Sequence, residues 1–370
     1  KPSEAQLSVI STTLKNLQES VQLTTQNFSL RQSIVHNLEK ILLQQFPDWN
    51  IELQLYGSSR SGFALINSDV NIGFSSSIPT SEMFKAFRDI LGFLNTNPNY
   101  ESVTLEWHNN TPVLYFEDAQ SKLLCKMSAF SQEFVKTSMF LQACVEKEPR
   151  LLTIGLAFRY WARLCNLDNE KSGLLPPTAF ILMCVYYFQT QRLLPFLQPG
   201  VAENSSSQTS GPEPLSSTST VSVSTVQEEL QKLKNLFAKW KTNNNESVGK
   251  LWLGLLRFYA IDFKYNKKIV CLRDKNLTRS DKGWNHSKFA IEDPYVIKKN
   301  VAAGISNGNV TLHIFLVLKY TYKYFAIPQL ADGPLFEFLE IKRGPNPRRK
   351  LANKNLEEDD EEEDDEDDEI

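Results

Sequence analysis

The chain has 370 residues and a net formal charge of −3. This length exceeds one ordinary hydrophobic core, so we expect two domains, each able to bury its own apolar interior. No run reaches the roughly 18 to 20 apolar residues of a spanning helix, and the N-terminus lacks a basic-then-apolar signal pattern, so no membrane partner is expected. The chain begins with Lys1 rather than Met, which predicts a piece of a longer protein.

The net charge conceals an uneven distribution along the chain. Residues 357–369 are an unbroken run of 13 acidic side chains, which repel one another and predict a solvated tail. Of the 43 acidic residues the other 30 face 40 Lys and Arg, so the rest of the chain has a net charge near +10. A body this basic favours a polyanionic partner such as nucleic acid, although basic surfaces also arise for solubility alone.

The cysteines are widely separated, and none stands near a histidine at zinc-finger spacing. This pattern predicts reduced thiols, mostly in the core, of a cytosolic or nuclear protein. They are Cys125, Cys144, Cys165, Cys184 and Cys271.

The first part of the chain predicts helices and strands around a small sheet. Apolar residues at three-to-four spacing predict two helices within residues 1–46, and Pro47 ends the second. The alternating segment from Asn50 reaches Gly57, which predicts a strand that enters a tight turn. The pattern then predicts a helix at 81–94 and strands at 102–107, 113–116 and 123–129. This order indicates a mixed α and β domain.

The helical period dominates the second part of the chain. Prolines before residues 150 and 177 mark helix starts, and helices are predicted at 134–146, 150–166, 177–190, 228–240, 248–263 and 310–325. A Ser/Thr-rich segment at about 202–226 lacks apolar periodicity and predicts a flexible insert. We therefore expect a first domain at 1–132, a mainly helical second domain at 133–330 and a disordered basic-then-acidic tail at 331–370.

The stretch YGSSRSGFALINSDVNI, residues 56–72, has the layout of a nucleotidyl-transfer site. Such sites hold two divalent cations with clustered carboxylates, and two Asp at i and i+2 on a strand supply two ligands on one face. A preceding Gly-Ser turn presents N–H groups and a hydroxyl to phosphates. Here Gly57, Ser58 and Asp69 are present, but position 71 is Asn71. An amide brings no negative charge to a hard ion such as Mg²⁺.

Three blocks of the sequence resemble the polymerase-β-like poly(A) polymerases and terminal uridylyltransferases. They are the stretch above, LAFRYWARLCNLDN at 156–169 and FAIEDPYVIKKNVAAGIS at 289–306, and they occur in the family's order. The resemblance implies an α+β fold: a polymerase-β-like nucleotidyltransferase domain with a small mixed sheet, then a mainly helical poly(A)-polymerase-associated domain. It covers roughly residues 30–328.

The resemblance also implies a degenerate active centre. The family's third catalytic Asp falls at Lys126, where an ammonium repels a metal ion by about 4 kcal/mol per unit charge at about 4 Å and an effective dielectric of about 20. The catalytic set at Gly57, Ser58, Asp69, Asn71 and Lys126 is therefore expected to hold no metal and to have no catalytic residue. A salt bridge between Lys126 and Asp69 is the preferred expectation, and a phosphate held by Lys126 is the alternative.

The nucleotide pocket of the family is altered in the same way. Pro177 and Thr178 stand where the family has a phosphate-binding hydroxyl and a base-stacking tyrosine, and Lys299 stands where uridylyltransferases have a uracil-selecting histidine. Arg159 and Arg163 remain as basic residues that meet phosphate in the implied pocket.

One branch of the family combines these features. SDVNI, LLCKMSA, RYWARLC and AIEDPY resemble the N-terminal, catalytically degenerate module of the zinc-knuckle uridylyltransferases. That resemblance implies a cytoplasmic module that docks a Lin-type RNA-binding cofactor on a let-seven precursor microRNA hairpin. It implies no cofactor for this module, with Mg²⁺ and UTP bound only at the parent's catalytic module. An active RNA terminal nucleotidyltransferase that uses Asp69 with unusual ligands, and a protein-only scaffold, are the alternatives.

Segment 264–299 is the predicted RNA contact. Its basic residues are interleaved with Trp284, His286 and Tyr295, and cations neutralise phosphates while aromatic rings stack on unpaired bases. The alternative is ordinary surface charge with Trp284 packed inward. The candidate residues are Lys267, Lys268, Arg273, Lys275, Arg279, Lys282, Lys288 and Lys298.

Overall fold

The computed structural model describes residues 2–108, 111–197 and 223–327. The predicted tail at 331–370 lies wholly outside these ranges, and so does the predicted insert at 202–226 apart from residues 223–226, which are helical. In the part of the chain that is described, no helix is long and apolar enough to cross a membrane.

Five strands form one mixed sheet, in the order β1-β2-β5-β4-β3. Strands β2 and β5 are parallel and the other neighbours are antiparallel. The strands predicted from Asn50 and at 102–107, 113–116 and 123–129 are present as β1 (Glu52–Tyr56), β3 (Tyr100–His108), β4 (Thr111–Asp118) and β5 (Leu124–Ala129). The fifth strand, β2 (Val70–Ser75), carries the end of the nucleotidyl-transfer stretch.

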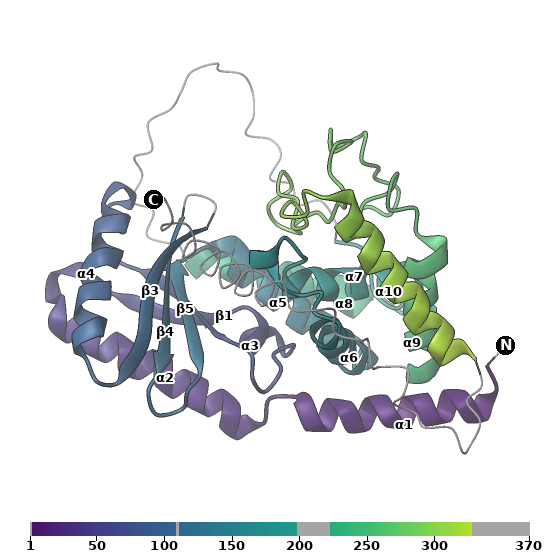
Figure 1. Cartoon of the computed structure of the whole chain (residues 1–370), viewed down its shortest axis with the longest axis horizontal. Helices are drawn as coiled ribbons and strands as arrows, with labels where there is room; N and C mark the ends of the chain where they lie inside the picture. The colour runs from purple at the N-terminus through teal and green to yellow at the C-terminus, as the bar shows by residue number, and fades with distance from the viewer. Residues whose placement is uncertain (1, 109–110, 198–222, 328–370) are drawn as a thin grey trace, which may run out of the picture. The chain divides into compact units, whose positions relative to one another are not determined.

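Helices α2 (Thr25–Gln45) and α4 (Met83–Thr96) cover one face of this sheet (Figure 1). Alternate strand residues point to opposite faces, so Ile72 and Met127 are fully buried against these helices and belong to the same apolar core. The intervening residues of β2 and β5 are left for the other face. That face carries the candidate site.

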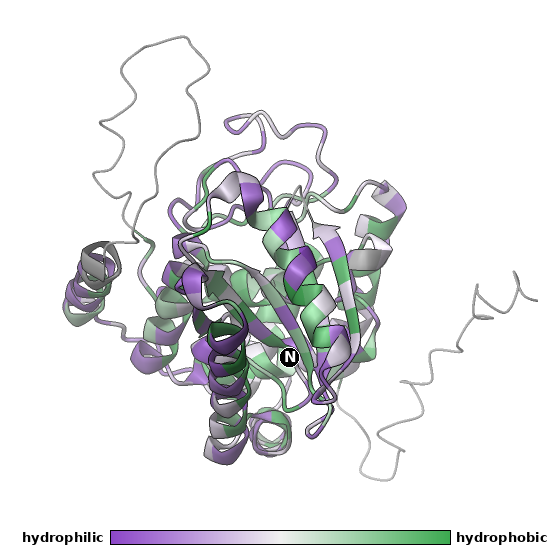
Figure 2. Ribbon diagram, turned by 90° about the vertical axis from the view of Figure 1, so that its left-hand side faces the viewer, coloured by the Kyte–Doolittle hydropathy of each residue, from purple (hydrophilic) through white to green (hydrophobic). Residues whose placement is uncertain are grey.

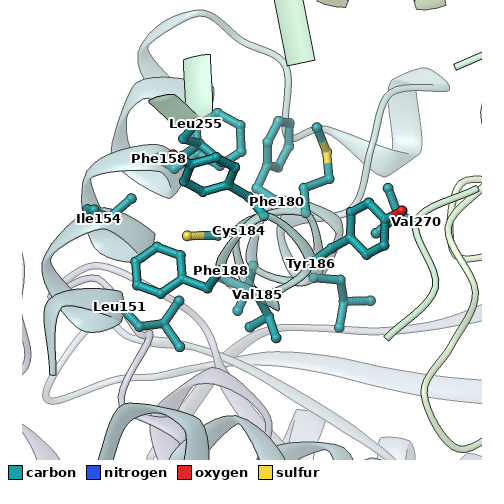
Figure 3. Packing of buried hydrophobic residues seen from close by; sticks show 14 of the residues in the cluster. Leu151, Ile154, Phe158, Phe180, Cys184, Val185, Tyr186, Phe188, Leu255 and Val270 are labelled. Atoms are coloured by element: carbon teal, nitrogen blue, oxygen red, sulfur yellow. The ribbon is translucent and has the colours of Figure 1, made fainter. Parts of the chain in front are cut away.

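A second, larger apolar core is built from helices. Helix α7 lies at its centre with buried side chains on all sides, and Figure 3 shows Phe180, Cys184 and Phe188 among neighbours from α6 and α9. Hydrophobic residues gather in the inner ribbons and hydrophilic ones on outer helices and loops (Figure 2). The helices are α5 (Gln132–Lys147), α6 (Arg150–Leu164), α7 (Pro177–Thr190), α8 (Val223–Lys239), α9 (Val248–Arg257) and α10 (Gly308–Ala326).

Residues that cap or begin helices explain where several of the helices start. Pro177 is the first residue of α7, where its missing N–H costs no hydrogen bond. Thr24 forms a capping box with Asn27 at the start of α2, and Ser247 caps α9. The sequence did not predict the four-residue helix α3 (Ser58–Ser61) or the π-helical turn η4 (Phe258–Asp262). It also did not predict the three 3₁₀ turns η1 (Pro47–Trp49), η2 (Thr80–Glu82) and η3 (Glu170–Ser172).

Helix α1 (Glu4–Val21) belongs to the helical core. Its buried Leu7, Ile10 and Leu14 contribute to that core, and its main contacts are with α9 and α6. A Cβ added at Gly249 of α9 would lie 2.2 Å from the carbonyl oxygen of Leu7. The packing therefore groups α1 with helices that follow residue 132, whereas the sequence grouped it with the sheet.

Candidate functional site

Four side chains form a row across the sheet face that α2 and α4 leave uncovered. Tyr56 of β1 is opposite Asn71 of β2, Asn71 is beside Lys126 of β5, and Lys126 is opposite Tyr115 of β4. Residues directly across a ladder share a face. The predicted neighbourhood of Asn71 and Lys126 is therefore confirmed, and Asp69 immediately precedes β2. We call these five residues the Asp69 row.

The expected salt bridge within the Asp69 row is present. The Lys126 Nζ lies 2.5 Å from the Asp69 Oδ2, and each side chain is about one-third exposed. The ammonium also lies 5.7 Å from the centre of the Tyr115 ring, and burial is the largest cause that raises the pKa of Tyr115 to about 12. Among the described residues, no group of three or more His, Cys, Asp or Glu side chains is arranged to hold a metal ion.

The Gly57 turn is held by a hydroxyl from the helical region. Gly57 has a φ of 69°, which favours glycine, and its N–H donates to the Ser138 Oγ of α5 at 3.0 Å. The backbone carbonyl of Ser58 accepts from the N–H of Ala64 at 3.0 Å. The Gly57 N–H, predicted to face phosphate, is thus used internally. Nothing in the sequence connects Ser138 with this turn.

Aromatic rings fill the position beside the row. Tyr56 stacks on Phe134 with 5.6 Å between ring centres, and its hydroxyl lies 3.2 Å from the Ser128 Oγ. The Lys299 Nζ lies 5.1 Å from the centre of the Phe134 ring and 3.4 Å from the Asp293 carboxylate. Lys299 therefore reaches the site as predicted, and Phe134 is a component that sequence reasoning missed.

The other two predicted pocket residues, Pro177 and Thr178, lie in the first turn of α7. Pro177 is partly buried and Thr178 is exposed.

Arginines from two helices donate hydrogen bonds to the backbone of the loop that leads to Asp69. Arg31 of α2, only 1% exposed, donates to the carbonyls of Ser68 at 2.7 Å and Ile66 at 3.1 Å. Arg159 of α6 is 4% exposed and donates to the carbonyl of Phe63, and burial lowers its pKa to about 10. Arg159 thus supports the backbone and does not face solvent, contrary to its predicted role at phosphate.

Arg163 occupies a more open position on the same loop. It donates to the Asn67 Oδ1 at 2.7 Å and lies 3.5 Å from the Asp168 carboxylate, with about one-third of its side chain exposed. The exposed part of the Arg163 side chain can still reach solvent, and its guanidinium already contacts Asn67 and Asp168.

The basic segment 264–299 is organised around one buried carboxylate. Glu292 is 1% exposed and lies 2.7 Å from the Arg273 guanidinium and 2.6 Å from the Lys282 Nζ. Arg279 is 6% exposed and donates to the carbonyls of three loop residues. Trp284 packs against a small buried cluster, which confirms the alternative that it points inward. Arg273, Arg279 and Lys282 are therefore mostly buried, with 18% of the Arg273 side chain and 15% of the Lys282 side chain exposed. Their internal partners do not favour the predicted contacts with RNA.

The other predicted RNA contacts lie at the surface. Lys268 is partly exposed and its Nζ donates to the Asn276 carbonyl at 3.4 Å. The exposed ones are Lys267, Lys275, Lys288 and Lys298.

Two segments of the chain match models of known families. Residues 1–129 match the TUTase nucleotidyltransferase domain, and residues 247–299 match the Cid1 family poly A polymerase. The chain is 31% identical to terminal uridylyltransferase 4 of Homo sapiens over 396 residues, covering 96% of this chain and 24% of that protein. It is 31% identical to terminal uridylyltransferase 7 of Homo sapiens over 351 residues, covering 88% and 23%. The chain thus spans about a quarter of the length of these relatives.

Solved structures show the same fold. The structure of Cid1 in complex with its short product ApU matches with a TM-score of 0.68 at 21% identity, covering 90% of this chain and 98% of that chain. A cytoplasmic RNA terminal U-transferase matches with a TM-score of 0.66 at 20% identity, covering 90% and 98%. The predicted α+β, polymerase-β-like fold with an associated helical domain is confirmed.

Proposed function

We propose that this chain is a non-catalytic, RNA-binding module of a larger uridylyltransferase. Over most of its length it is homologous to the terminal uridylyltransferases. The observation that carries this proposal is the ion pair of Lys126 with Asp69. It stands on the strands where nucleotidyl transfer requires clustered carboxylates.

The charge of the Asp69 row opposes metal binding. Two-metal transfer needs carboxylates that hold both cations, but the row offers Asp69, the neutral amide of Asn71 and the cation of Lys126. An ammonium at about 4 Å repels each unit of metal charge by about 4 kcal/mol at an effective dielectric of about 20. Lys126 thus neutralises Asp69 in place of a metal ion.

The phosphate side of the site supports the same proposal. The Gly57 N–H is donated to Ser138, and Phe134 stacks on Tyr56 beside Lys299. An incoming triphosphate would have to displace these internal contacts. Mg²⁺ and UTP accordingly belong to a separate catalytic module in the parent protein, and this module requires neither.

RNA is the proposed partner because the relatives are named terminal uridylyltransferases and a solved neighbour is an RNA terminal U-transferase. The exposed lysines of segment 264–299 supply cations for phosphates. We propose a precursor microRNA hairpin of the let-seven type as the RNA and a Lin-type RNA-binding protein as the cofactor that shares it. The proposal includes a cytoplasmic location, which five free cysteines support.

The test measures binding of a precursor microRNA hairpin as a function of salt concentration, with and without the cofactor protein. Binding should weaken steeply with salt, and its slope gives the number of phosphate contacts. Replacement of Lys267→Gln together with Lys288→Gln should reduce that slope by about 2. Lys15→Gln, an exposed charge on α1, is the matched control and should leave it unchanged.

Two outcomes would contradict the proposal. Hairpin mobility that is unchanged at low salt, with and without the cofactor, would indicate a protein-only scaffold. A loss in the Lys15 control that is half of the loss in the double variant, and so equal per charge removed, would indicate general attraction to a basic body rather than contact with segment 264–299.

A further inference from the structure

A cavity of about 850 Å³ lies in the helical region, and none of its lining residues belongs to the Asp69 row. Its walls come from the end of α7, from residues 240–244 after α8, and from the loop at residues 273–276, with Phe196 between them. Pockets that bind small molecules and cofactors have volumes of about 300–1,000 Å³. The cavity is therefore large enough for one nucleotide.

Two aromatic rings line this cavity, and each is held by a contact with another residue of the helical region. The Trp240 Nε1 donates to the carbonyl of Leu193 at 3.2 Å, and the side chain remains partly exposed. Phe196 packs edge to face against Tyr186, with 6.3 Å between ring centres. A fixed and partly exposed indole is a surface on which a base of any sequence can stack.

Cations stand around the same cavity. Arg192, Lys241 and Lys275 are exposed lining residues. The partly exposed Arg273 and one exposed carboxylate, Asp274, also line the cavity, so the lining carries a net positive charge. Arg192 has a φ of 59°, the left-handed conformation that ends α7, where the N–H of Leu193 donates to the carbonyl of Phe188. The carbonyl of Lys275 accepts from the Tyr186 hydroxyl at 3.3 Å, which anchors its loop to α7. These side chains lie where the phosphates on either side of a bound base would pass.

The polar part of the wall suits the edge of a base. Gln189 is 2% exposed and its Nε2 donates to the carbonyls of Pro195 at 2.9 Å and Leu272 at 3.0 Å. These bonds hold the amide inside the cavity wall, where its Oε1 is itself buried. Further side-chain amides line the cavity at Asn243 and Asn276. Amides both donate and accept, as the edge of an unpaired base requires.

We propose that this cavity binds one unpaired nucleotide of a single-stranded RNA segment, with the base on Trp240 and the flanking phosphates at Lys241 and Lys275. The proposal rests on the proposed function, that the chain binds RNA, and adds a site for a single strand. A duplex does not fit the same chemistry, because the bases of paired RNA are stacked on one another and are recognised mainly by shape.

The test uses the full chain and a fluorescently labelled single-stranded oligouridylate, with affinity measured by anisotropy at several salt concentrations. Trp240→Leu should weaken binding about tenfold, and Trp240→Phe should retain most of the affinity because a ring remains. Lys241→Gln should weaken binding and reduce the salt slope by about 1. Lys232→Gln, on the exposed side of α8 with 65% of its side chain exposed, is the matched control and should change neither.

The outcomes separate this inference from the proposed function. If the unaltered chain binds neither the oligouridylate nor a hairpin, the proposed function fails. If it binds RNA and neither Trp240→Leu nor Lys241→Gln alters binding, the cavity is not the site. Free uridine monophosphate that binds as tightly as the oligomer, with the same dependence on Trp240, would overturn the assignment to RNA.

A second readout does not depend on how well the Trp240 variants fold. A 4-thiouridine oligomer, cross-linked by light to the unaltered chain, should attach to peptides that contain residues 240–244 or 273–276. Cross-links confined to other peptides would overturn the assignment.

Discussion

The Lys126 ammonium lies 2.5 Å from the Asp69 carboxylate, across the parallel pair of strands at the centre of the sheet. Both side chains are about one-third exposed, so solvent screens their attraction. This pair explains how a carboxylate immediately before β2 is kept without an uncompensated charge.

A double-mutant cycle measures this relationship. Lys126→Ala, Asp69→Asn and the double variant should give a coupling free energy of about 0.5–1 kcal/mol in urea unfolding, because exposed ion pairs contribute little. The coupling should shrink at about 1 M salt, where the Debye length is about 3 Å. A coupling of zero at low salt would show that the pair does not stabilise the fold.

Restoring the carboxylates should create a metal site. Asn71→Asp together with Lys126→Asp places three carboxylates on adjacent strand positions with Asp69. Mn²⁺ binding, measured by electron paramagnetic resonance, should be absent in the unaltered chain and present in the double variant, because hard cations bind through carboxylate charge. Equal Mn²⁺ binding by both proteins would contradict the proposed effect of Lys126.

Glu292 should be a strong determinant of stability. Glu292→Gln leaves the charges of Arg273 and Lys282 poorly compensated in a mostly buried position, so the free energy of unfolding should fall by about 3 kcal/mol. Glu101→Gln is the control, because Glu101 pairs with Lys122 at the surface and its loss should cost less than about 1 kcal/mol. Similar losses in the two variants would contradict this account of the basic segment.

Two glycine substitutions test the docking of α1. Gly249→Ala places a methyl group 2.2 Å from the Leu7 carbonyl and should lower the free energy of unfolding by about 1–3 kcal/mol. Gly92→Ala in α4 meets no atom within 4 Å and should raise stability by about 0.4–1 kcal/mol. Thermal unfolding distinguishes them, and a neutral Gly249→Ala would mean that α1 does not pack tightly on α9.

Stability should fall in alkaline solution. Burial raises the pKa of Cys165 and Cys271 to about 11 and that of Cys125 to about 12, from an ordinary value of 9.0. Between about pH 9 and 11 the unfolded chain loses these protons while the folded chain keeps them. The free energy of unfolding therefore falls with rising pH, by up to about 1.4 kcal/mol per pH unit for each thiol.

Denaturant titrations at pH 8, 9 and 10.5 check this slope. Cys165→Ala removes one of these thiols and should make the decline shallower. A free energy of unfolding that stays constant up to pH 10.5 would show that the thiols are not shielded as the packing indicates.

Periodic elements were predictable from the sequence because burial of one face imposes a repeat of 2 or 3.6 residues. The strands β1, β3, β4 and β5 and the long helices follow from that repeat. Helix α3 was missed because four residues are too few for a period, and η4 was merged with α9 because its apolar pattern continues without a break. The place of α1 depends on contacts with α9, more than 200 residues later, which no local pattern reveals.

The site was predictable where it lies on one stretch or on adjacent strands. Asp69, Asn71 and Lys126 lie together as expected: one motif contains the first two, and the resemblance to the family supplied Lys126. Ser138 and Phe134 were missed because they reach Gly57 and Tyr56 only through tertiary packing. Charged side chains caused the remaining errors: Arg159 and Arg279 are basic and were predicted at the surface, but their partners are backbone carbonyls, which a sequence does not distinguish.

The most direct measurement is incorporation of labelled UTP and ATP into the 3′ end of an RNA by the purified chain, with Mg²⁺ and with Mn²⁺. No incorporation is expected from a protein that still binds the RNA. Incorporation that Asp69→Ala abolishes would contradict this expectation, and would show that this chain is an active terminal nucleotidyltransferase.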